Sequence, residues 1–219
     1  PRLRQSETCA LMKTKGQPAL RHDLPYAAPG QVIGLLGGSF DPAHNGHVHI
    51  TKTALQRFGL DQVWWLVSPG NPLKEKQPAE MGARLAQARR VMRHPKVQGT
   101  DIEAHLGTRY TAQTIQALQQ RYFGVNFVWL MGADNLAQFH GWQDWRWIMD
   151  NVPVGVMARP GDRISARMSK AARVYRHAKI SGRSAKLLSR VDTPTWCLIN
   201  LPMSPQSSSA IRAAGACCG

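Results

Sequence analysis

Short apolar runs alternate with amphipathic segments over most of this chain, and the alternation limits the folds that it can adopt. The apolar runs have the length of buried strands, and the segments between them have the spacing of helices. Strand-like runs occupy residues 32–36, 62–68, 97–102, 125–132, 152–158 and 195–201, and helical patterns occupy residues 47–59, 80–94 and 111–122. Strands separated by helices of this length pair in parallel. The sequence therefore predicts a single α/β domain built on a doubly wound parallel sheet.

The bulk composition is that of one globular domain with a tail. The chain has 219 residues, of which 43% are hydrophobic and 19% are charged. The first thirty residues are basic and proline-containing without clear periodicity, so we expect a flexible leader over residues 1–30 and the folded domain over residues 31–219. The sequence contains no run of eighteen apolar residues, so it predicts no membrane-spanning helix. The four cysteines lack paired metal-ligand spacing, which favours reduced thiols and a cytoplasmic protein.

Much of the positive charge is concentrated in one segment. The net charge is +15, and residues 159–190 hold ten Lys or Arg against Asp162 alone, so that they carry nine of these charges. Such a segment can bind nucleic acid or acidic lipid. Only Tyr175 offers it an aromatic ring for stacking on bases, and a charge run is more typical of a solvated helix face. We expect a basic helical region without a nucleic-acid partner.

The stretch "IGLLGGSFDPAHNGHVHI", residues 33–50, carries the main chemical signal. Gly37 and Gly38 follow the first strand, where glycines permit positive φ and let an anion approach the backbone. A helix that begins near Asn45 directs its N-terminal N–H groups and its positive dipole end toward the same place. His44 and His47 stand three residues apart on its first turn. Two imidazoles at such a site can donate hydrogen bonds to phosphate oxygens.

Other interpretations of this stretch fit less well. A metal site would need more ligands, and the turn adds only Asp41, so we expect no metal held by the protein. The spacing matches neither the dinucleotide pattern G-x-G-x-x-G nor the Walker pattern G-x-x-x-x-G-K-[ST]. A purely structural turn would explain the glycines but not the two histidines. The stretch therefore indicates a phosphate-binding turn with functional histidines.

"GGSFDPAHNGH", residues 37–47, resembles the GG-x-F-D-P-x-H-x-G-H motif of nucleotidyltransferases related to class I aminoacyl-tRNA synthetases. Four more segments follow in the order of one family within that superfamily, the nicotinate-nucleotide adenylyltransferases: "NPLK" at residues 71–74, "TRYTAQT" at 108–114, "GADNLAQFHGWQDW" at 132–145 and "SSSAIR" at 207–212. The resemblance covers residues 31–214. It implies a Rossmann-like nucleotidyltransferase fold. It also implies transfer of the adenylyl group of ATP to nicotinate mononucleotide, giving deamido-NAD and pyrophosphate in NAD biosynthesis.

The resemblance also implies a role for individual residues. The implied catalytic residues are His44, His47 and Arg212. The residues expected to bind ATP and its phosphates are Gly37, Gly38, Ser39, Phe40, Lys74, Asp134, Ser208, Ser209 and Ile211. The residues expected to bind nicotinate mononucleotide are Tyr110, Thr111 and Trp142. In this scheme the Trp142 ring stacks on the pyridine, and backbone N–H groups near Thr111 receive the carboxylate.

The implied reaction is attack by the phosphate of nicotinate mononucleotide on the α-phosphorus of ATP, without a covalent intermediate. Mg²⁺ is expected with ATP, held largely by substrate oxygens and water. Four residues are expected to supply positive charge, namely His44, His47, Lys74 and Arg212. The chain departs from the family pattern at two positions: Leu73 replaces the usual histidine, and Gln143 replaces a frequent tyrosine.

Two alternatives remain open. One is a sister adenylyltransferase, such as one acting on phosphopantetheine, and the other is a nucleic-acid-binding protein that uses residues 159–190. The sequence does not define an oligomeric state.

Overall fold

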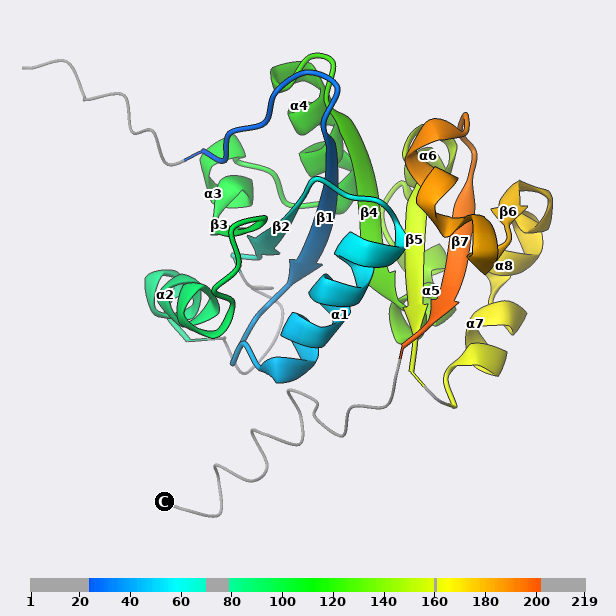
Figure 1. Ribbon diagram of the computed structural model, residues 1–219, viewed down its shortest axis with the longest axis horizontal. Helices are drawn as coiled ribbons and strands as arrows, with labels where there is room; N and C mark the ends of the chain where they lie inside the picture. Colours follow the sequence, from blue (N-terminus) through cyan, green and yellow to red (C-terminus); the bar gives the residue numbers. More distant parts are fainter. Residues whose placement is uncertain (1–23, 70–78, 160, 202–219) are drawn as a thin grey trace, which may run out of the picture.

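The computed structural model describes residues 24–69, 79–159 and 161–201. Within them, seven parallel strands form one sheet in the order β3-β2-β1-β4-β5-β7-β6 (Figure 1). The strands are β1 (Val32–Gly38), β2 (Gln62–Val67), β3 (Val97–Thr100), β4 (Asn126–Gly132), β5 (Val154–Ala158), β6 (Lys179–Ile180) and β7 (Trp196–Asn200). The predicted doubly wound α/β fold is confirmed.

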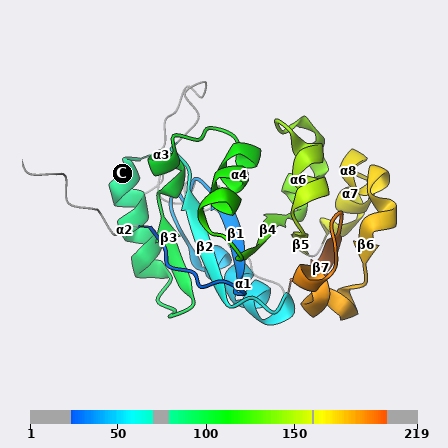
Figure 2. The ribbon, with the colours of Figure 1, turned by 90° about the horizontal axis from the view of Figure 1, so that it is seen from above.

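Helices cover both faces of the sheet (Figure 2). One face carries α1 (Asn45–Arg57), α2 (Met81–Val91) and the 3-10 segment η3 (Gly182–Arg190). The other carries α3 (Ile102–Leu106), α4 (Thr111–Arg121), α5 (Ala133–Gln138), η1 (Phe139–Gly141), α6 (Trp145–Asn151), α7 (Arg163–Met168), α8 (Lys170–Val174) and η2 (Arg176–Ala178). Successive side chains of a strand point to opposite faces of the sheet, so each strand contributes to both hydrophobic cores. In β2, for example, Trp64 lies in one core and Trp65 in the other.

The two halves of the sheet meet between β1 and β4. From β1 the chain crosses outward to β2 and then β3, and it returns to the other side of β1 to form β4. In doubly wound sheets the ligand-binding crevice lies beyond the carboxyl ends of the strands at such a reversal. The residues after β1 and β4 are therefore placed together by the topology alone.

The basic segment is not one continuous helical region. Within residues 161–190 the chain forms α7, α8, η2, β6 and η3, and β6 pairs with β7 as an edge strand that the sequence pattern did not reveal. Serine side chains mark the breaks: Ser169 caps α8 by accepting the Ala172 N–H at 3.2 Å, and Ser181 caps η3 by accepting the Arg183 N–H at 3.2 Å. The helical pieces α7, α8, η2 and η3 bury apolar residues, mainly alanines, and leave their cations exposed to solvent.

The residues just before β1 contact the domain. Leu24 and Ala27 pack against the core, the Tyr122 hydroxyl donates to the Pro25 carbonyl at 2.8 Å, and the Gly30 N–H donates to the Gly124 carbonyl at 2.7 Å. Residues 24–30, which we expected to belong to a flexible leader, therefore pack against the folded domain. The remainder of the expected leader lies outside the described residues.

Candidate active site

The glycine turn, residues 37–44, lies at the carboxyl end of β1. Gly37 and Gly38 are the last residues of the strand, and neither has a positive φ. A Cβ atom on Gly37 would come within 2.8 Å of the Trp129 ring, so glycine at this position is required by packing. The positive φ that we expected of the glycines belongs instead to Phe40, at 47°.

Packing holds Phe40 in this conformation. Its buried ring stacks on Trp65 with centroids 4.7 Å apart and an interplanar angle of 12°, and it contacts the His47 ring at 4.9 Å. The Trp65 indole N–H donates to Thr51 Oγ1 at 2.7 Å, and the Thr51 hydroxyl donates to the His47 carbonyl at 2.8 Å. A positive φ at a residue other than glycine costs about 1–3 kcal/mol and persists only where the surroundings over-determine it. The turn is therefore shaped before any ligand binds.

His44 and His47 cap the helix α1 reciprocally. The Nδ1 atom of His44 accepts the Gly46 N–H at 3.0 Å, and Nδ1 of His47 accepts the His44 N–H at 3.3 Å. A ring nitrogen that accepts a hydrogen bond carries no proton, so each neutral ring has its proton on Nε2. The Gly46 and His47 N–H groups are bonded within this turn, and the imidazoles rather than these amides must meet an anion.

Both imidazoles are neutral near pH 7. Burial, followed by the charges of His44 and Arg159, lowers the pKa of His47 to about 3. Burial, followed by the charge of Arg159, also lowers the pKa of His44, which is 6% exposed. We expected these histidines to supply positive charge, but burial and the nearby Arg159 charge disfavour the protonated form of each ring in the ligand-free protein.

Arg159 is the site residue that sequence reasoning missed. It directly follows β5, beside β4, and its charge acts on both histidines. The signal was its place at the carboxyl end of a buried strand, where loops of this fold carry the chemistry. Its position at the start of the basic segment hid that signal. Arg159 therefore lies close enough to both imidazoles for its charge to disfavour their protonation.

Asp134 lies where the adenosine side of the site was expected. It stands in the first turn of α5, which begins directly after β4. Its side chain is exposed and folds back over Gly132, where any Cβ atom would overlap the carboxylate. The topology thus brings Asp134 to the same edge of the sheet as the glycine turn, while its contact with adenosine stays a prediction.

The loop expected to receive the nicotinate carboxylate opens α4. Tyr110 precedes this helix, Thr111 is its first residue, and Tyr110 is 44% exposed. The Gln113 Oε1 atom accepts the Arg109 and Tyr110 N–H groups, both at 3.4 Å. These hydrogen bonds are long, so an incoming carboxylate can compete for the same donors.

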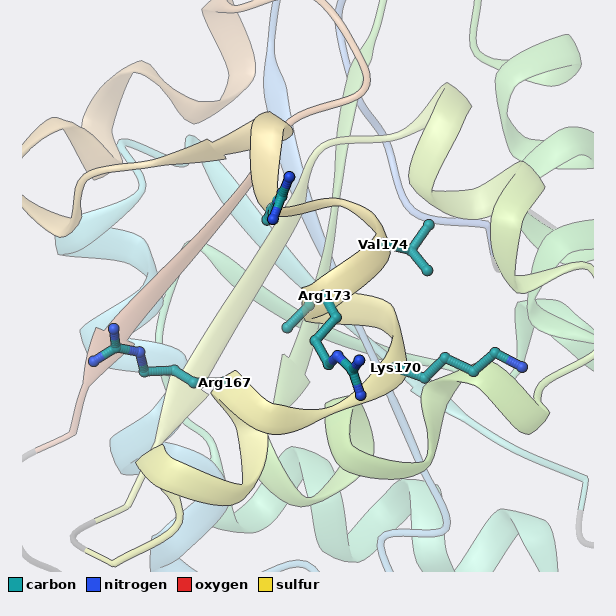
Figure 3. A pocket seen from close by; sticks show the side chains of 6 residues that line it. Arg167, Lys170, Arg173 and Val174 are labelled. Carbon is teal, nitrogen blue, oxygen red and sulfur yellow. The ribbon is translucent and has the colours of Figure 1, made fainter.

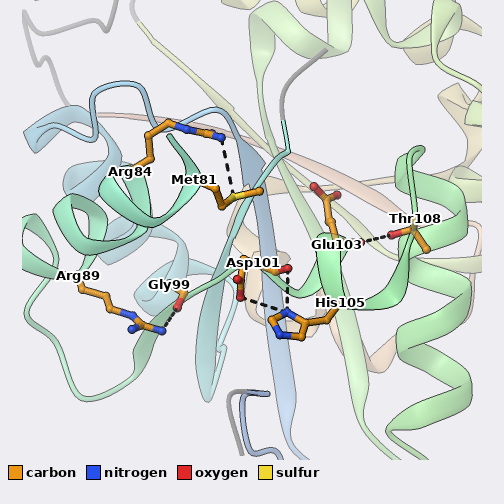
Figure 4. A network of polar contacts seen from close by, with 8 residues as sticks. All are labelled: Met81, Arg84, Arg89, Gly99, Asp101, Glu103, His105 and Thr108. Carbon is orange, nitrogen blue, oxygen red and sulfur yellow. Dashed lines mark hydrogen bonds and ion pairs between the residues drawn. The ribbon is translucent and has the colours of Figure 1, made fainter. Parts of the chain in front are cut away.

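A part-buried polar network supports this loop. The Thr108 hydroxyl donates to the Glu103 carbonyl at 3.5 Å (Figure 4). The same carbonyl accepts the Thr108 N–H at 3.1 Å. The Thr114 hydroxyl donates to Glu103 Oε1 at 3.3 Å and lies 2.8 Å from the Thr108 hydroxyl. Burial raises the pKa of Glu103 to about 7, although the Thr114 hydrogen bond opposes the rise. Glu103 lies in the short helix α3, and no sequence pattern indicated this arrangement.

Trp142 is linked to the glycine turn through another tryptophan. Its half-buried ring packs edge-on against Phe139 at 5.2 Å and Trp129 at 6.3 Å, and the Trp129 ring also covers Gly37. Trp142 lies outside the helix α6, because Asp144 adopts a left-handed conformation with φ of 53° and α6 starts after it. The expected stacking of Trp142 on the pyridine stays a prediction.

The structure brings His44, His47, Phe40, Gly37 and Gly38 together at one edge of the sheet, with Ser39 between them. Five further predicted site residues, Lys74, Ser208, Ser209, Ile211 and Arg212, lie outside the described residues.

The basic segment forms a separate, open hollow of about 700 Å³ on α7, α8 and η2. Its lining includes Arg167, Lys170, Arg173 and Arg176. The labelled Arg167 and Lys170 side chains point in opposite directions, so these cations do not converge on one ligand (Figure 3). None of the predicted site residues lines this hollow.

Neither a cluster of metal ligands nor a membrane-spanning helix is found in the described part of the chain. Over residues 24–69, 79–159 and 161–201, no three His, Cys, Asp or Glu side chains gather as they would around a metal ion. The helices in the same ranges lack the length and apolar character that crossing a bilayer requires.

The parallel sheet with its reversal at β1, and the histidine pair that caps the following helix, are together the architecture that the resemblance to the nucleotidyltransferases implied. The sequence model of the cytidylyltransferase-like family matches residues 35–214. A probable nicotinate-nucleotide adenylyltransferase of Ruegeria pomeroyi is 64% identical over 196 residues, covering 90% of this chain and 92% of the relative. One of Roseobacter denitrificans is 62% identical, covering 90% and 98%. The chain therefore belongs to the cytidylyltransferase-like family and, within it, to the nicotinate-nucleotide adenylyltransferases.

A solved structure shares the fold. The Plasmodium falciparum nicotinic acid mononucleotide adenylyltransferase, complexed with NaAD, superposes with a TM-score of 0.64 at 16% sequence identity, covering 84% of this chain and 83% of that chain.

Proposed function

We infer that the protein transfers the adenylyl group of ATP to nicotinate mononucleotide, releasing pyrophosphate and forming deamido-NAD. Relatives with more than 60% identity over nearly their whole length carry this activity in their names. The observation in the structure that carries the inference is the His44–His47 pair at the start of α1, directly beyond β1 and beside β4.

In the proposed reaction, a phosphate oxygen of nicotinate mononucleotide attacks the α-phosphorus of ATP. A new P–O bond forms as the bond to the bridging oxygen of pyrophosphate breaks, and the electron pair leaves with pyrophosphate. The nucleophile is already ionised, so the protein needs mainly to align the two substrates and to stabilise the charge that develops.

The imidazoles contribute as neutral donors. With Nδ1 of each ring engaged by backbone, Nε2–H is the atom that can donate to phosphate oxygens. Approaching phosphates favour the protonated ring, so binding ATP should raise both pKa values. Arg159 and the positive end of the α1 dipole add the fixed positive field.

The proposed nicotinate mononucleotide site distinguishes a carboxylate from an amide by the hydrogen-bond donors that it offers. We propose that backbone N–H groups near Tyr110 and Thr111 bind the nicotinate carboxylate in place of Gln113, and that Trp142 stacks on the pyridine ring. Backbone donors match a carboxylate and leave the NH₂ group of an amide unmatched, which favours the acid over nicotinamide mononucleotide. Lys74, Ser208, Ser209 and Arg212 are proposed as further phosphate ligands on the strength of the resemblance.

We propose that Mg²⁺ binds together with ATP and is held by substrate oxygens and water rather than by protein side chains. The described side chains offer no cluster of carboxylates to hold it, and a Mg²⁺ ion usually keeps several waters and binds substrate phosphates. We also propose a cytoplasmic enzyme whose basic segment is a solvated surface and not a nucleic-acid site. A shift of labelled RNA that persists at about 0.15 M salt would contradict the last point.

Pyrophosphate release with a panel of acceptors tests the function. The protein with ATP and Mg²⁺ should release pyrophosphate with nicotinate mononucleotide, more slowly with nicotinamide mononucleotide, and not with phosphopantetheine. Faster release with phosphopantetheine would assign the chain to the sister activity.

A further inference from the structure

Arg84 of α2 is buried and its guanidinium binds backbone rather than carboxylate. The side chain is 2% exposed. Its Nε donates to the Ala79 carbonyl at 2.7 Å, and its Nη1 donates to the Ser39 carbonyl at 2.7 Å and to the Ser68 carbonyl at 2.9 Å. Nη2 contacts Met81 Sδ at 3.8 Å (Figure 4). Within the described part of the chain, no carboxylate lies within ion-pair distance of it.

The carboxylate of Glu80, the acidic residue nearest to Arg84 in the sequence, binds backbone N–H groups. Both carboxylate oxygens of Glu80 accept N–H groups of the first turn of α2, from Gly82 at 2.8 Å and Ala83 at 2.9 Å. Burying an arginine without a partner carboxylate is unfavourable unless its donors are satisfied. Here three backbone carbonyls satisfy it, which indicates that the position of those carbonyls matters.

Two of these carbonyls terminate neighbouring strands. Ser39 follows β1 and Ser68 follows β2, and a single guanidinium nitrogen binds both. The Ser68 N–H also donates to the Gly38 carbonyl at 3.0 Å, which continues the pairing of these strands. Arg84 thus ties α2 to the carboxyl ends of β1 and β2, where the glycine turn begins.

The Arg84 hydrogen bond sets the direction of the Ser39–Phe40 peptide. In a trans peptide the C=O and N–H bonds point in opposite directions, so a Ser39 carbonyl aimed at Arg84 directs the Phe40 N–H away from Arg84. The positive φ of Phe40 and the stacking of its ring on Trp65 hold the next part of the turn.

We propose that Arg84 is a positioning residue for ATP: by holding the Ser39 carbonyl, it turns the Phe40 N–H toward the phosphates bound at the glycine turn. The proposal rests on the proposed function in one respect, that the phosphates of ATP bind at the glycine turn. It does not depend on which acceptor receives the adenylyl group. We expect the effect to fall on ATP rather than on the acceptor, because within the described residues the hydrogen bonds of Arg84 go to Ala79, Ser39, Ser68 and Met81 and none reaches the loop before α4 or Trp142.

Arg84→Lys tests the proposal, because lysine keeps the charge but loses the planar fork that bridges several carbonyls. The Kd of the variant for ATP, measured by calorimetry without acceptor, should rise tenfold or more, while the KM for nicotinate mononucleotide stays within twofold. Ala88→Gly is the matched control, since it destabilises the same helix from its buried side without touching the turn. It should lower the Tm and leave ATP binding within twofold.

An unchanged Kd for ATP in Arg84→Lys would overturn the proposal, and so would an equal loss of ATP binding in Ala88→Gly. A second measurement needs no variant. In the wild-type protein, a non-hydrolysable ATP analogue should shift the Phe40 amide proton downfield and slow its exchange, and an unmoved amide would also overturn the proposal. If the wild type binds ATP but releases no pyrophosphate with nicotinate mononucleotide, the acceptor assignment is wrong. The role of Arg84 is then still tested by the Kd for ATP.

Discussion

The His44 and His47 rings lie 4.0 Å apart between centroids, and each uses Nδ1 to accept a backbone N–H of the same helical turn. This reciprocal cap makes the two imidazoles part of the helix start and fixes which nitrogen carries the proton. A mobile pair of cationic histidines could not present its donors in one defined orientation.

His47→Ala should lower kcat far more than it changes KM, because its contact is proposed to strengthen mainly in the transition state. Losing one preorganised donor suggests a fall in kcat of about 10²-fold or more. Steady-state kinetics with both substrates checks this. An unchanged kcat with a raised KM for ATP would show that His47 binds the ground state only.

His47 should also make stability depend on pH. Its pKa of about 3 in the folded protein lies below the ordinary 6.5, so the unfolded chain binds protons more readily between these values. The free energy of unfolding should therefore fall as the pH drops from about 6.5 toward 3, by at most about 1.4 kcal/mol per pH unit from this residue. Urea unfolding at pH 7.5, 6.5 and 5.5 should show a shallower loss for His47→Gln than for the wild type. Parallel curves would mean that His47 titrates normally.

Trp142→Ala should weaken nicotinate mononucleotide and leave ATP nearly unaffected. The loss of a stacking ring suggests about 1–3 kcal/mol on the scale of base stacking. Separate KM values for the two substrates measure it, and Trp142→Phe should recover part of the loss. A variant in which both KM values rise together would instead indicate a general packing role against Trp129 and Phe139.

Removing the charges of Arg173, Arg176 and Lys179 together should leave kcat within a few-fold, because these side chains lie on the open basic surface away from the glycine turn. A loss of kcat/KM at low salt that fades at about 0.15 M would reflect only steering of anionic substrates. Arg159→Gln is the matched contrast: it should reduce activity at both salt concentrations and raise the pKa of His47 in NMR titration. If the triple variant loses kcat at both salt concentrations, the basic segment reaches the site.

The sequence predicted most of the sheet because buried strands such as β2 and β4 are continuous apolar runs. It missed β6, whose two residues are too short for any periodicity, and it joined several short helices into one basic region because the capping roles of Ser169 and Ser181 depend on local geometry. The histidines were identified from their spacing. Their neutrality was not, since it arises from burial and from Arg159, more than 100 residues away along the chain. Arg84 likewise looks like a surface residue until the carbonyls of Ser39 and Ser68 are brought to it by folding.

Direct attack of the acceptor phosphate on the α-phosphorus is tested by the stereochemistry of the transfer. ATP in which sulfur replaces one non-bridging oxygen of the α-phosphate, used as a single diastereomer at the α-phosphorus, should react with nicotinate mononucleotide and give a dinucleotide with inverted configuration at that phosphorus. Inversion is the result expected of a single in-line displacement, with His44 and His47 acting only as donors. Retention of configuration would require two displacements through a covalent adenylylated protein and would contradict the donor role of both histidines.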